Sequence, residues 1–359
     1  LTTIAWGAPR SIPSQYVESI RTALLAEQSM TQTASDTYGS GKNLAAVARL
    51  ALIADEIGET TIATSIRSRL KTLLQSWFNG QNSDKIIYDH TWGGVTSSNG
   101  IKDSGADYGV GYYNDVHFHF GYFVYASAVV AKGDSAWAAS WAPAINDLVR
   151  AYANPVHDSY FPVTRMKDWF AGHSWASGLF EFGDVKNQES SSESINGYYG
   201  MYLWGLVTNN NNLRDLGRVL LAQEIRSTKK YWHMDGRTNE VYDQVFADNG
   251  CVGIVWGMKI DFATWFGTNI EYIIGIQMMP FTPITEEYMT NTWVNTVYPT
   301  LSTALTRSSP VLEVGWRGFI YMAQAVLDRA SAWTNINTLA GWDNGNSKTN
   351  ALYWVATRA

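Results

Sequence analysis

The chain contains little charge and almost no cysteine. Charged residues make up 16% of its 359 residues, and the formal net charge is −6. No basic run of the kind that neutralises a phosphate backbone occurs, so the sequence predicts no nucleic-acid partner. No apolar stretch approaches the roughly 20 residues of a membrane-spanning helix, so no membrane partner is predicted either.

The single cysteine, Cys251, cannot form an internal disulfide. It lies in the apolar stretch CVGIVW (251–256) and is predicted to fill the core. Its isolation does not decide the cellular compartment, because large secreted domains fold without disulfides. The sequence also lacks an Asn-x-Ser/Thr acceptor and a signal peptide, and it begins at Leu1. We therefore expect a processed or trimmed product.

Aromatic residues, in contrast, are abundant: the chain has 16 Trp, 20 Tyr and 13 Phe, and 46% of its residues are hydrophobic. Indole and phenol rings fill large cores, and they also offer flat faces to a ligand. Composition alone leaves both interpretations open.

Apolar residues recur at three- and four-residue spacing in many segments, which is typical of amphipathic helices. Helices are predicted over 13–28, 42–58, 60–78, 115–132, 134–152, 190–207, 211–229, 284–305 and 314–333. Long loops are expected over 89–114 and 154–188, and short strand-like pieces near 238–247. Many helices joined by long loops, without a linker, favour one all-α domain over 1–359, built as a ring of helical hairpins, an α/α toroid.

Two glutamates lie four residues apart in the segment GDVKNQESSSESINGYYGMYLWG (183–205). Ser190 and Glu193 have the spacing of a capping box, which would explain Glu193 as part of a helix start. Glu189 would then lie just outside the helix, with its carboxylate free to face a cleft. A helix N-terminus stabilises negative charge, so we expect a depressed pKa for Glu189, which suits a general base.

A second acidic group, Asp115, begins the aromatic segment GYYNDVHFHFGYFVYASAVVAKG (111–133). Asp115 could cap a helix, or act as an acid whose pKa is raised by the surrounding rings. Asp115, His117 and His119 could also form a metal site. On a helix, however, the two histidines would point roughly 200° apart, so a metal site is the weaker interpretation.

Large rings and polar groups also gather in two later segments. The loop FPVTRMKDWFAGHSWASGLFEFGD (161–184) holds Asp168, Trp169, His173 and Trp175, and so many rings in a loop indicate a binding role. The segment DFATWFGTNIEYIIGIQMMPFTPIT (261–285) holds Trp265, although helix core is the better explanation for most of its positions.

Carboxylates in separate segments, among aromatic rings and without a metal or phosphate motif, fit glycoside hydrolysis. One carboxylic acid protonates the leaving oxygen, and one carboxylate activates water or attacks directly. Sugar rings stack on indoles, which accounts for the tryptophan content. This chemistry needs no cofactor. The residues alone indicate a carbohydrate-active enzyme and decide neither the polymer nor the stereochemistry.

Five motifs in order resemble glycoside hydrolase family 81. They are YNDVHFHFGYF (113–123), DWFAGHSWASGLF (168–180), VKNQESSSESINGYYG (185–200), DFATWFG (261–267) and GIQMMPFTPIT (275–285). The resemblance implies an (α/α)6 toroid and an inverting endo-β-1,3-glucanase that acts on laminarin- or curdlan-type β-1,3-glucans. It implies Asp115 as general acid, Glu189 as general base and Glu193 as its essential neighbour.

The aromatic segments and the matching motifs also predict the glucan-binding side chains, and the resemblance implies the compartment. The predicted substrate contacts are Tyr113, His119, Asp168, Trp169, His173, Trp175, Asn187, Gln188 and Trp265. A secreted protein is expected, and we predict a monomer.

The sequence departs from the family at several points. Val116 and Ile274 stand where the family usually has histidines, and we expect weaker sugar contacts or slower chemistry from their loss. The family's N-terminal β-sandwich and small α/β domain are expected to be absent. The alternatives are a non-catalytic β-glucan-binding protein, another toroid enzyme such as a β-1,4-glucanase or a polysaccharide lyase, and a metal-dependent hydrolase.

Overall fold

The computed structural model describes residues 4–238 and 240–359 and is mainly helical. The first two thirds contain the long helices α1 (Ser14–Glu27), α2 (Thr37–Glu56), α3 (Thr60–Phe78), α4 (Val116–Gly133), α5 (Ser135–Ala153), α6 (Ser191–Val207) and α7 (Asn211–Ser227). The last third contains α8 (Gln244–Ala247), α9 (Ile270–Gly275), the 3₁₀ segment η5 (Pro283–Glu287), α10 (Asn291–Leu301), α11 (Val314–Gln324), α12 (Arg329–Thr338) and α13 (Lys348–Ala356).

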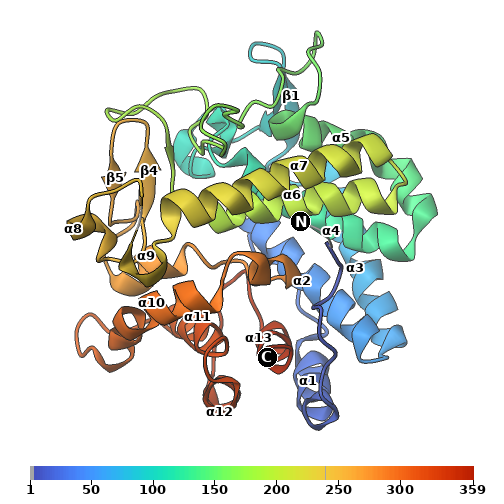
Figure 1. Cartoon of the computed structure of the whole chain (residues 1–359). Helices are drawn as coiled ribbons and strands as arrows, with labels where there is room; N and C mark the ends of the chain where they lie inside the picture. Colours follow the sequence, from blue (N-terminus) through green and yellow to red (C-terminus); the bar gives the residue numbers. More distant parts are fainter. Residues whose placement is uncertain (1–3, 239) are drawn as a thin grey trace.

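The helices form a closed double ring (Figure 1). Its inner positions are taken in order by α2, α4, α6, α9 with η5, α11 and α13, and α13 contacts α2 to close the ring. The outer helices are α3, α5, α7, α10, α12 and α1, each packed on an inner neighbour. This arrangement is the predicted α/α toroid.

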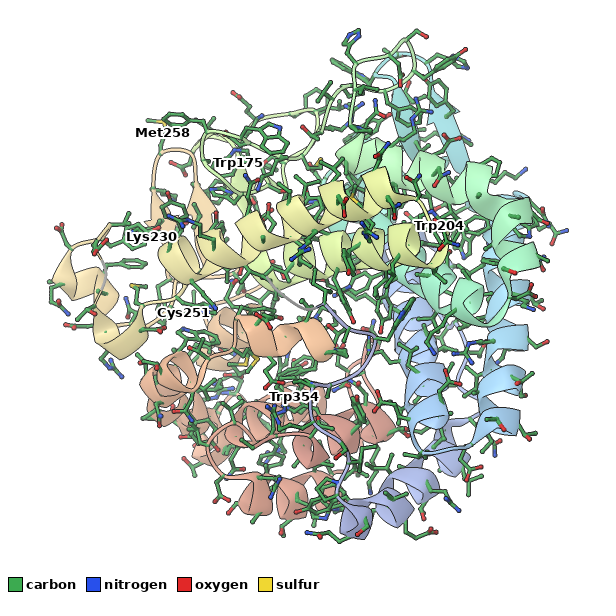
Figure 2. The ribbon with its side chains drawn as sticks, turned by 45° about the vertical axis from the view of Figure 1, so that its right-hand side comes forward. Trp175, Trp204, Lys230, Cys251, Met258 and Trp354 are labelled. Atoms are coloured by element: carbon green, nitrogen blue, oxygen red, sulfur yellow. The ribbon has the colours of Figure 1, made fainter. Side chains whose placement is uncertain are left out.

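Burial explains which helices lie inside. On α4, all residues from Val116 to Ala131 are buried, so this helix contacts protein on every face. The outer helix α3 buries a single stripe, formed by Ala63, Ile66, Arg67, Leu70, Leu74 and Trp77. A helix that is apolar all round belongs in the interior, whereas one with a stripe covers it. Figure 2 shows Trp204 and Trp354 within this helical body, both with little exposed surface.

Two glycines bring α4 and α6 unusually close together. A Cβ atom on Gly121 would lie 2.5 Å from the Cα atom of Gly197. A Cβ atom on Gly197 would lie 2.1 Å from the backbone oxygen of His117. No side chain fits at either position, so the inner helices are in backbone contact just below the start of α4 and α6.

Short strands shape the loops above the ring. Strands β1 (Ile86–Asp89) and β2 (Gly94–Ser97) form an antiparallel hairpin. Strand β3 (Asn187–Gln188) pairs with β4 (Ile254–Trp256), which pairs with β5 (Ile260–Asp261). In Figure 1, the β1 hairpin and the loop after α5 project from the upper side, and β4 and β5 lie at one edge.

Several predicted boundaries were wrong. The helix predicted over 284–305 is divided into η5, α10 and a further 3₁₀ segment, η6 (Ser302–Thr306), because Thr290 caps a new helix by accepting a hydrogen bond from the Trp293 N–H. The helix predicted over 314–333 is interrupted before α12, whose N-cap is Asp328. The segment predicted to be strand-like, 238–247, contains α8 and no strand among its described residues, and residue 239 lies outside the described part.

Two further sequence expectations can be compared with the structure. Cys251 is fully buried, which confirms its predicted place in the core; Figure 2 shows it inside the lower half of the molecule. Over residues 4–238 and 240–359, no helix is long and apolar enough to span a bilayer.

Candidate active site

The three predicted catalytic carboxylates line one cavity. It has a volume of about 620 Å³ and is bounded by inner helices and by the loops above them. Its lining residues are Tyr38, Lys42, Tyr108, Asn114, Asp115, Phe118, Ala176, Ser177, Phe182, Asn187, Glu189, Glu193, Trp265, Phe266, Ile276, Met279, Trp316 and Asp343. Segments that are far apart in the sequence therefore meet at this site.

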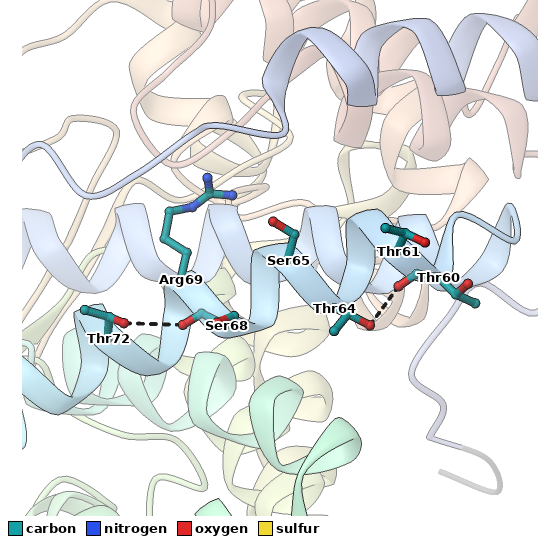
Figure 3. A pocket seen from close by; sticks show the side chains of 7 residues that line it. All are labelled: Thr60, Thr61, Thr64, Ser65, Ser68, Arg69 and Thr72. Carbon is teal, nitrogen blue, oxygen red and sulfur yellow. Dashed lines mark hydrogen bonds between the residues drawn. The ribbon is translucent and has the colours of Figure 1, made fainter.

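A second hollow of about 660 Å³ runs along the outer helix α3 (Figure 3). It is lined by Thr60, Thr61, Thr64, Ser65, Ser68, Arg69 and Thr72, none of which is a carboxylate. The hydroxyl of Thr64 donates to its own helix at the Thr60 carbonyl, at 2.8 Å. This groove offers no acid–base pair, and we place the functional site in the cavity with the carboxylates.

Asp115 occupies the position before α4 in a left-handed backbone conformation, with φ of 59°. Its N–H donates to the Ala176 carbonyl at 2.9 Å. Its carboxylate does not cap α4, and no described side chain or N–H donates to it through a recorded hydrogen bond. Desolvation raises the pKa of Asp115 well above its ordinary value, and the charges of Glu189 and Glu193 raise it further. The predicted rise is confirmed, and the capping alternative was wrong.

Glu189 directly follows β3, and this strand fixes its backbone. The Trp265 N–H donates to Glu189 Oε1 at 2.8 Å. Desolvation raises the pKa of Glu189 to about 7, and Glu193 adds to the rise although the Trp265 hydrogen bond opposes it. The expected depression by the helix start was wrong, because loss of water outweighs the helix dipole here.

Ser190 is the N-cap of α6, as predicted. Its hydroxyl accepts a hydrogen bond from the Glu193 N–H at 3.3 Å. The reciprocal half of the capping box is absent among the recorded contacts, because the Glu193 carboxylate turns toward the cavity. It accepts a hydrogen bond from the Tyr122 hydroxyl at 2.7 Å and lies 3.7 Å from the Lys42 ammonium.

Gln277 also fixes the start of α6, through hydrogen bonds of its side-chain amide. Its Nε2 donates to the Glu189 carbonyl at 2.7 Å and to the Gly253 carbonyl at 3.0 Å. Its Oε1 accepts from the hydroxyl of Ser191 at 2.8 Å. One buried amide thus orients the backbone of the proposed base and the first turn of the helix that carries Glu193.

Lys42 supplies positive charge to this acidic site. It comes from α2 and is buried beside Tyr38, with its ammonium 5.2 Å from that ring's centroid. Burial opposes its charged form, but Glu193 and other nearby acidic groups outweigh this, so the pKa of Lys42 is raised. A permanently charged ammonium next to Glu193 partly balances the three carboxyl groups.

Aromatic rings form the walls of the cavity and its rim. Tyr38 and Tyr108 lie 4.7 Å apart between centroids on one side. Trp265 packs against Phe182 at 5.1 Å, and Phe266 stacks on Trp316 at 5.9 Å. Trp265 is 54% exposed, so an apolar face remains open to a ligand. Flat exposed rings around acidic groups suit the alternating apolar and hydroxyl surfaces of a sugar chain.

Comparison with known sequences shows which protein family combines such carboxylates and aromatic rings. A sequence profile described as "Glycosyl hydrolase family 81 C-terminal domain" matches residues 11–355. The chain belongs to glycoside hydrolase family 81. A protein of Glycine max named "Glucan endo-1,3-beta-D-glucosidase" is 36% identical over 368 residues, which cover 99% of this chain and 55% of the relative. The "Primary septum glucan endo-1,3-beta-D-glucosidase" of Schizosaccharomyces pombe is 38% identical, over 86% of this chain and 30% of the relative.

A solved structure of a family 81 glycoside hydrolase from Clostridium thermocellum (CtLam81A) has the same fold. The superposition has a TM-score of 0.83 at 29% sequence identity, and it covers 98% of this chain and 49% of that one. The chain thus spans about half the length of the Glycine max relative and of this structure.

Four residues predicted as sugar contacts in this family 81 chain do not line the cavity. Asp168 instead accepts hydrogen bonds from the N–H groups of Phe170 and Ala171 and from the indole of Trp175. His173 is buried against Trp175, with ring centroids 4.5 Å apart. Figure 2 shows Trp175 among the loops above the α6–α7 pair. For the fourth predicted contact, Trp169, the indole donates to the Thr164 hydroxyl.

The remaining predicted contacts divide into two groups. Asn187 and Trp265 line the cavity, and the Trp265 indole donates to Asn187 Oδ1 at 3.3 Å. Tyr113, His119 and Gln188 are buried and do not line it. The expectation that these three line the cavity was wrong, because each side chain is buried against other protein atoms.

Two of these buried residues support other side chains of the site region. The Tyr113 hydroxyl donates to Asp89 Oδ2 at 3.1 Å. His119 lies behind Tyr38, with ring centroids 3.7 Å apart and Nδ1 3.0 Å from the Tyr38 carbonyl oxygen. His119 therefore holds the ring that faces the cavity.

The histidines considered as metal ligands do not converge. His117 Nε2 lies 2.9 Å from Gln188 Oε1, whereas His119 contacts Tyr38. Across residues 4–238 and 240–359, no three His, Cys, Asp or Glu side chains form a metal-binding group. Val116 and Ile274, which stand where the family usually has histidines, are fully buried in the core. Neither lines the cavity, and weaker sugar contacts or slower chemistry from the missing histidines stays a prediction.

The sequence interpretation missed several cavity residues, notably Tyr38, Lys42, Tyr108, Trp316 and Asp343. They come from α2, the loop before α4, α11 and the loop before α13. A signal for Lys42 was present, because a lysine followed by a long apolar helical stretch has no obvious solvated face. No comparable signal marked Trp316 or Asp343.

Proposed function

We propose that the chain hydrolyses internal β-1,3-glucosidic bonds of β-1,3-glucans with inversion at the anomeric carbon. The observation that carries this proposal is the grouping of Asp115, Glu189 and Glu193 in one ring-lined cavity. The names of the relatives, which are glucan endo-1,3-β-D-glucosidases, support the substrate and the bond.

Asp115 is the proposed general acid. Its carboxyl faces the cavity without a recorded hydrogen bond, and its raised pKa keeps it protonated where an ordinary aspartate would be ionised. The proton passes from Asp115 to the glycosidic oxygen while the bond between that oxygen and the anomeric carbon breaks. Such proton transfer contributes on the order of 10²–10⁴ to the rate.

Glu189 is the proposed general base. A water molecule attacks the anomeric carbon from the face opposite the leaving oxygen and passes a proton to the Glu189 carboxylate. A base works best when its pKa lies near the working pH, and a pKa of about 7 meets that condition. The hydrogen bond from the Trp265 N–H to Oε1 fixes the carboxylate and leaves Oε2 for the water.

Glu193 assists without taking the proton. The Tyr122 hydroxyl and the Lys42 ammonium hold its carboxylate on the cavity side of α6. From there its charge raises the pKa of both Asp115 and Glu189. The same carboxylate can orient the attacking water.

The inverting assignment also makes a geometric prediction. Room for the water requires the Asp115 and Glu189 carboxyl groups to stand roughly 6.5–9.5 Å apart, against about 5–5.5 Å in a retaining pair. We further propose that the protein is secreted, since a polymeric glucan is too large to be taken up intact, and that it acts as a monomer.

The activity is tested by incubation with laminarin and with curdlan. Endo-hydrolysis gives a ladder of oligosaccharides, and NMR of the first product shows the α-anomer. Glucose as the sole early product would exclude endo action, and a first product with the β-configuration would exclude inversion. An ultraviolet-absorbing product would indicate a lyase.

Azide distinguishes the two glutamates. A small anion replaces a missing base at an inverting site, so Glu189→Ala with azide is expected to form an α-glycosyl azide. Glu193→Ala is the matched comparison, and azide is not expected to restore its rate. Restoration of Glu193→Ala alone would exchange the two roles.

A further inference from the structure

A buried hydrogen bond joins the segments that carry the proposed acid and base. His117 lies in the first turn of α4, two residues after Asp115, and Gln188 directly precedes Glu189. His117 Nε2 and Gln188 Oε1 are 2.9 Å apart, and both side chains are fully buried. Neither lines the cavity, so neither can contact a ligand there.

A second path joins the same segments through the backbone. The Asp115 N–H donates to the Ala176 carbonyl at 2.9 Å, and the Ala176 N–H donates to the Asn187 carbonyl at 2.7 Å. The backbone contact of α4 with α6 and the hydrogen bonds of Asn187 to the Ser177 hydroxyl hold the same region. The His117–Gln188 bond adds a side-chain connection that lies within two residues of both Asp115 and Glu189.

Stability alone does not account for this polar pair. Removing one partner of a buried hydrogen bond leaves the other unsatisfied, at a cost of about 1–3 kcal/mol. Replacing both by apolar groups of the same shape is close to neutral. An apolar pair would therefore fill this place equally well if only packing mattered.

The hydrogen bond between His117 and Gln188 also stays the same over the pH range in which Glu189 titrates. Burial lowers the pKa of His117 to about 4, although Gln188 and the Glu224 charge oppose the shift. His117 is therefore neutral wherever Glu189, with its pKa of about 7, is ionised. The bond does not change while the two carboxyl groups titrate.

We propose that His117 and Gln188 are positioning residues that set the separation between the Asp115 and Glu189 carboxyl groups. The proposal rests on the proposed function, in which these two groups act on opposite sides of one bond. A misplacement of about 1 Å in a reacting group can cost about 10²-fold in rate. The pair should therefore affect kcat much more than KM.

The test compares His117→Phe, Gln188→Met and the double variant with the wild-type protein. Each change removes one end of the hydrogen bond and roughly keeps its volume, and the double variant leaves neither end unsatisfied. Asn146→Leu is the matched control, because it removes a 2.8 Å hydrogen bond from the indole of Trp204, far along α6. Measurements are kcat and KM on soluble laminarin, melting temperature, and a crystal structure of the double variant.

The single variants are expected to melt earlier, and the double variant is expected to regain stability while kcat stays down by about 10²-fold. Its crystal structure should show a changed separation between the two carboxyl groups. Asn146→Leu should melt earlier with an unchanged kcat. Recovery of wild-type kcat in the double variant, or an unchanged carboxyl separation, would overturn the proposal.

Failure of the proposed function can be told apart from failure of this proposal. If the wild-type protein cleaves no β-1,3-glucan, the function is wrong. The carboxyl separation in the double variant still decides whether the pair sets that distance.

Discussion

The cavity and the loop 161–184 contain the same kinds of residue and use them in opposite ways. The loop's Asp168 accepts three hydrogen bonds, from two N–H groups and the Trp175 indole. These outweigh its partial burial and lower its pKa. In the cavity, the Asp115 carboxylate has no recorded donor, and desolvation and neighbouring charge raise its pKa.

The comparison separates carboxylates that build structure from those available for chemistry. A carboxylate surrounded by donors is stabilised as an anion and braces the chain, whereas one without donors retains affinity for a proton. The histidines do not show this division, since His173 and His119 are both buried and pack against neighbouring rings. Four variant experiments test how far this division holds.

The largest effect, on kcat, is expected from replacing Asp115, and replacing Asp168 is the comparison. Asp115→Asn should lower kcat on laminarin by about 10²–10⁴-fold with little change in melting temperature, because only the proton is lost. Asp168→Ala should lower stability by about 1–3 kcal/mol and leave kcat within a few-fold. If Asp168→Ala abolishes activity in a folded protein, the loop is part of the site.

Two tryptophans extend the comparison to the aromatic rings. Trp175 is partly buried against His173, and its truncation to alanine should cost about 2–4 kcal/mol of stability. Trp265→Ala should weaken glucan binding by about 1 kcal/mol, or several-fold in KM, with a nearly unchanged melting curve. Thermal melts and laminarin titrations measure both. The reverse pattern would place Trp175 at the ligand.

The raised pKa of Glu189 predicts a pH-dependent cost of folding. A carboxyl group with a raised pKa in the folded state favours folding below its unfolded pKa, near 4.5, and this contribution is lost as the pH rises through about 7. Glu189→Gln should therefore raise stability at pH 8, by about 1–3 kcal/mol, and have little effect at pH 4.

Asp168→Asn should change stability at pH 8 in the opposite direction to Glu189→Gln, so it serves as the comparison. Its lowered pKa stabilises the fold above the unfolded value and loses this contribution as the pH falls. The variant should thus be less stable than the wild-type protein at pH 8, and the difference should shrink in acid. Melting temperatures of both variants against pH give the comparison. Parallel curves for Glu189→Gln and Asp168→Asn would contradict it.

The smallest expected effect concerns Lys42. Its charge opposes the rise in the pKa of Glu189. Lys42→Met should therefore raise the pKa of Glu189 further. The acidic limb of the kcat/KM profile should move to higher pH, because Glu189 is then ionised only at higher pH. Lys71→Met, which removes a cation paired with Asp134 on the outer ring, is the control and should leave the profile in place. An acidic limb that shifts to lower pH would exclude this role for Lys42.

Local signals predicted the helices and the start of α6 well. The segment 60–78 agrees with α3 at both ends, and Ser190 is the N-cap as its spacing indicated. Both features depend on residues close in the sequence, because the spacing of apolar residues predicts a helix and the capping residue marks its start. The interruption between α11 and α12 was missed, since the apolar period continues across it and only the Asp328 cap marks the new start.

The cavity was predicted only where its residues belong to conspicuous motifs. Asp115, Glu189 and Glu193 were found because acids in aromatic surroundings stand out. Asp168 and Trp175 stood out in the same way, and the sequence could not show that they bind each other. Which carboxylate lacks donors is decided by tertiary contacts, as in the hydrogen bond from the Trp265 N–H to Glu189 across 76 positions.

The backbone contact between α4 and α6 has a consequence for which positions of this fold can vary. Any side chain at Gly121 or Gly197 would force the two helices apart and displace Asp115 relative to Glu189 and Glu193. Single replacements at these two glycines therefore cannot change the contact between α4 and α6 gradually. Rim residues such as Tyr108 and Trp265, which are 72% and 54% exposed, can be exchanged one at a time. Changes in ligand preference are thus expected at the rim, whereas the contact between α4 and α6 tolerates none.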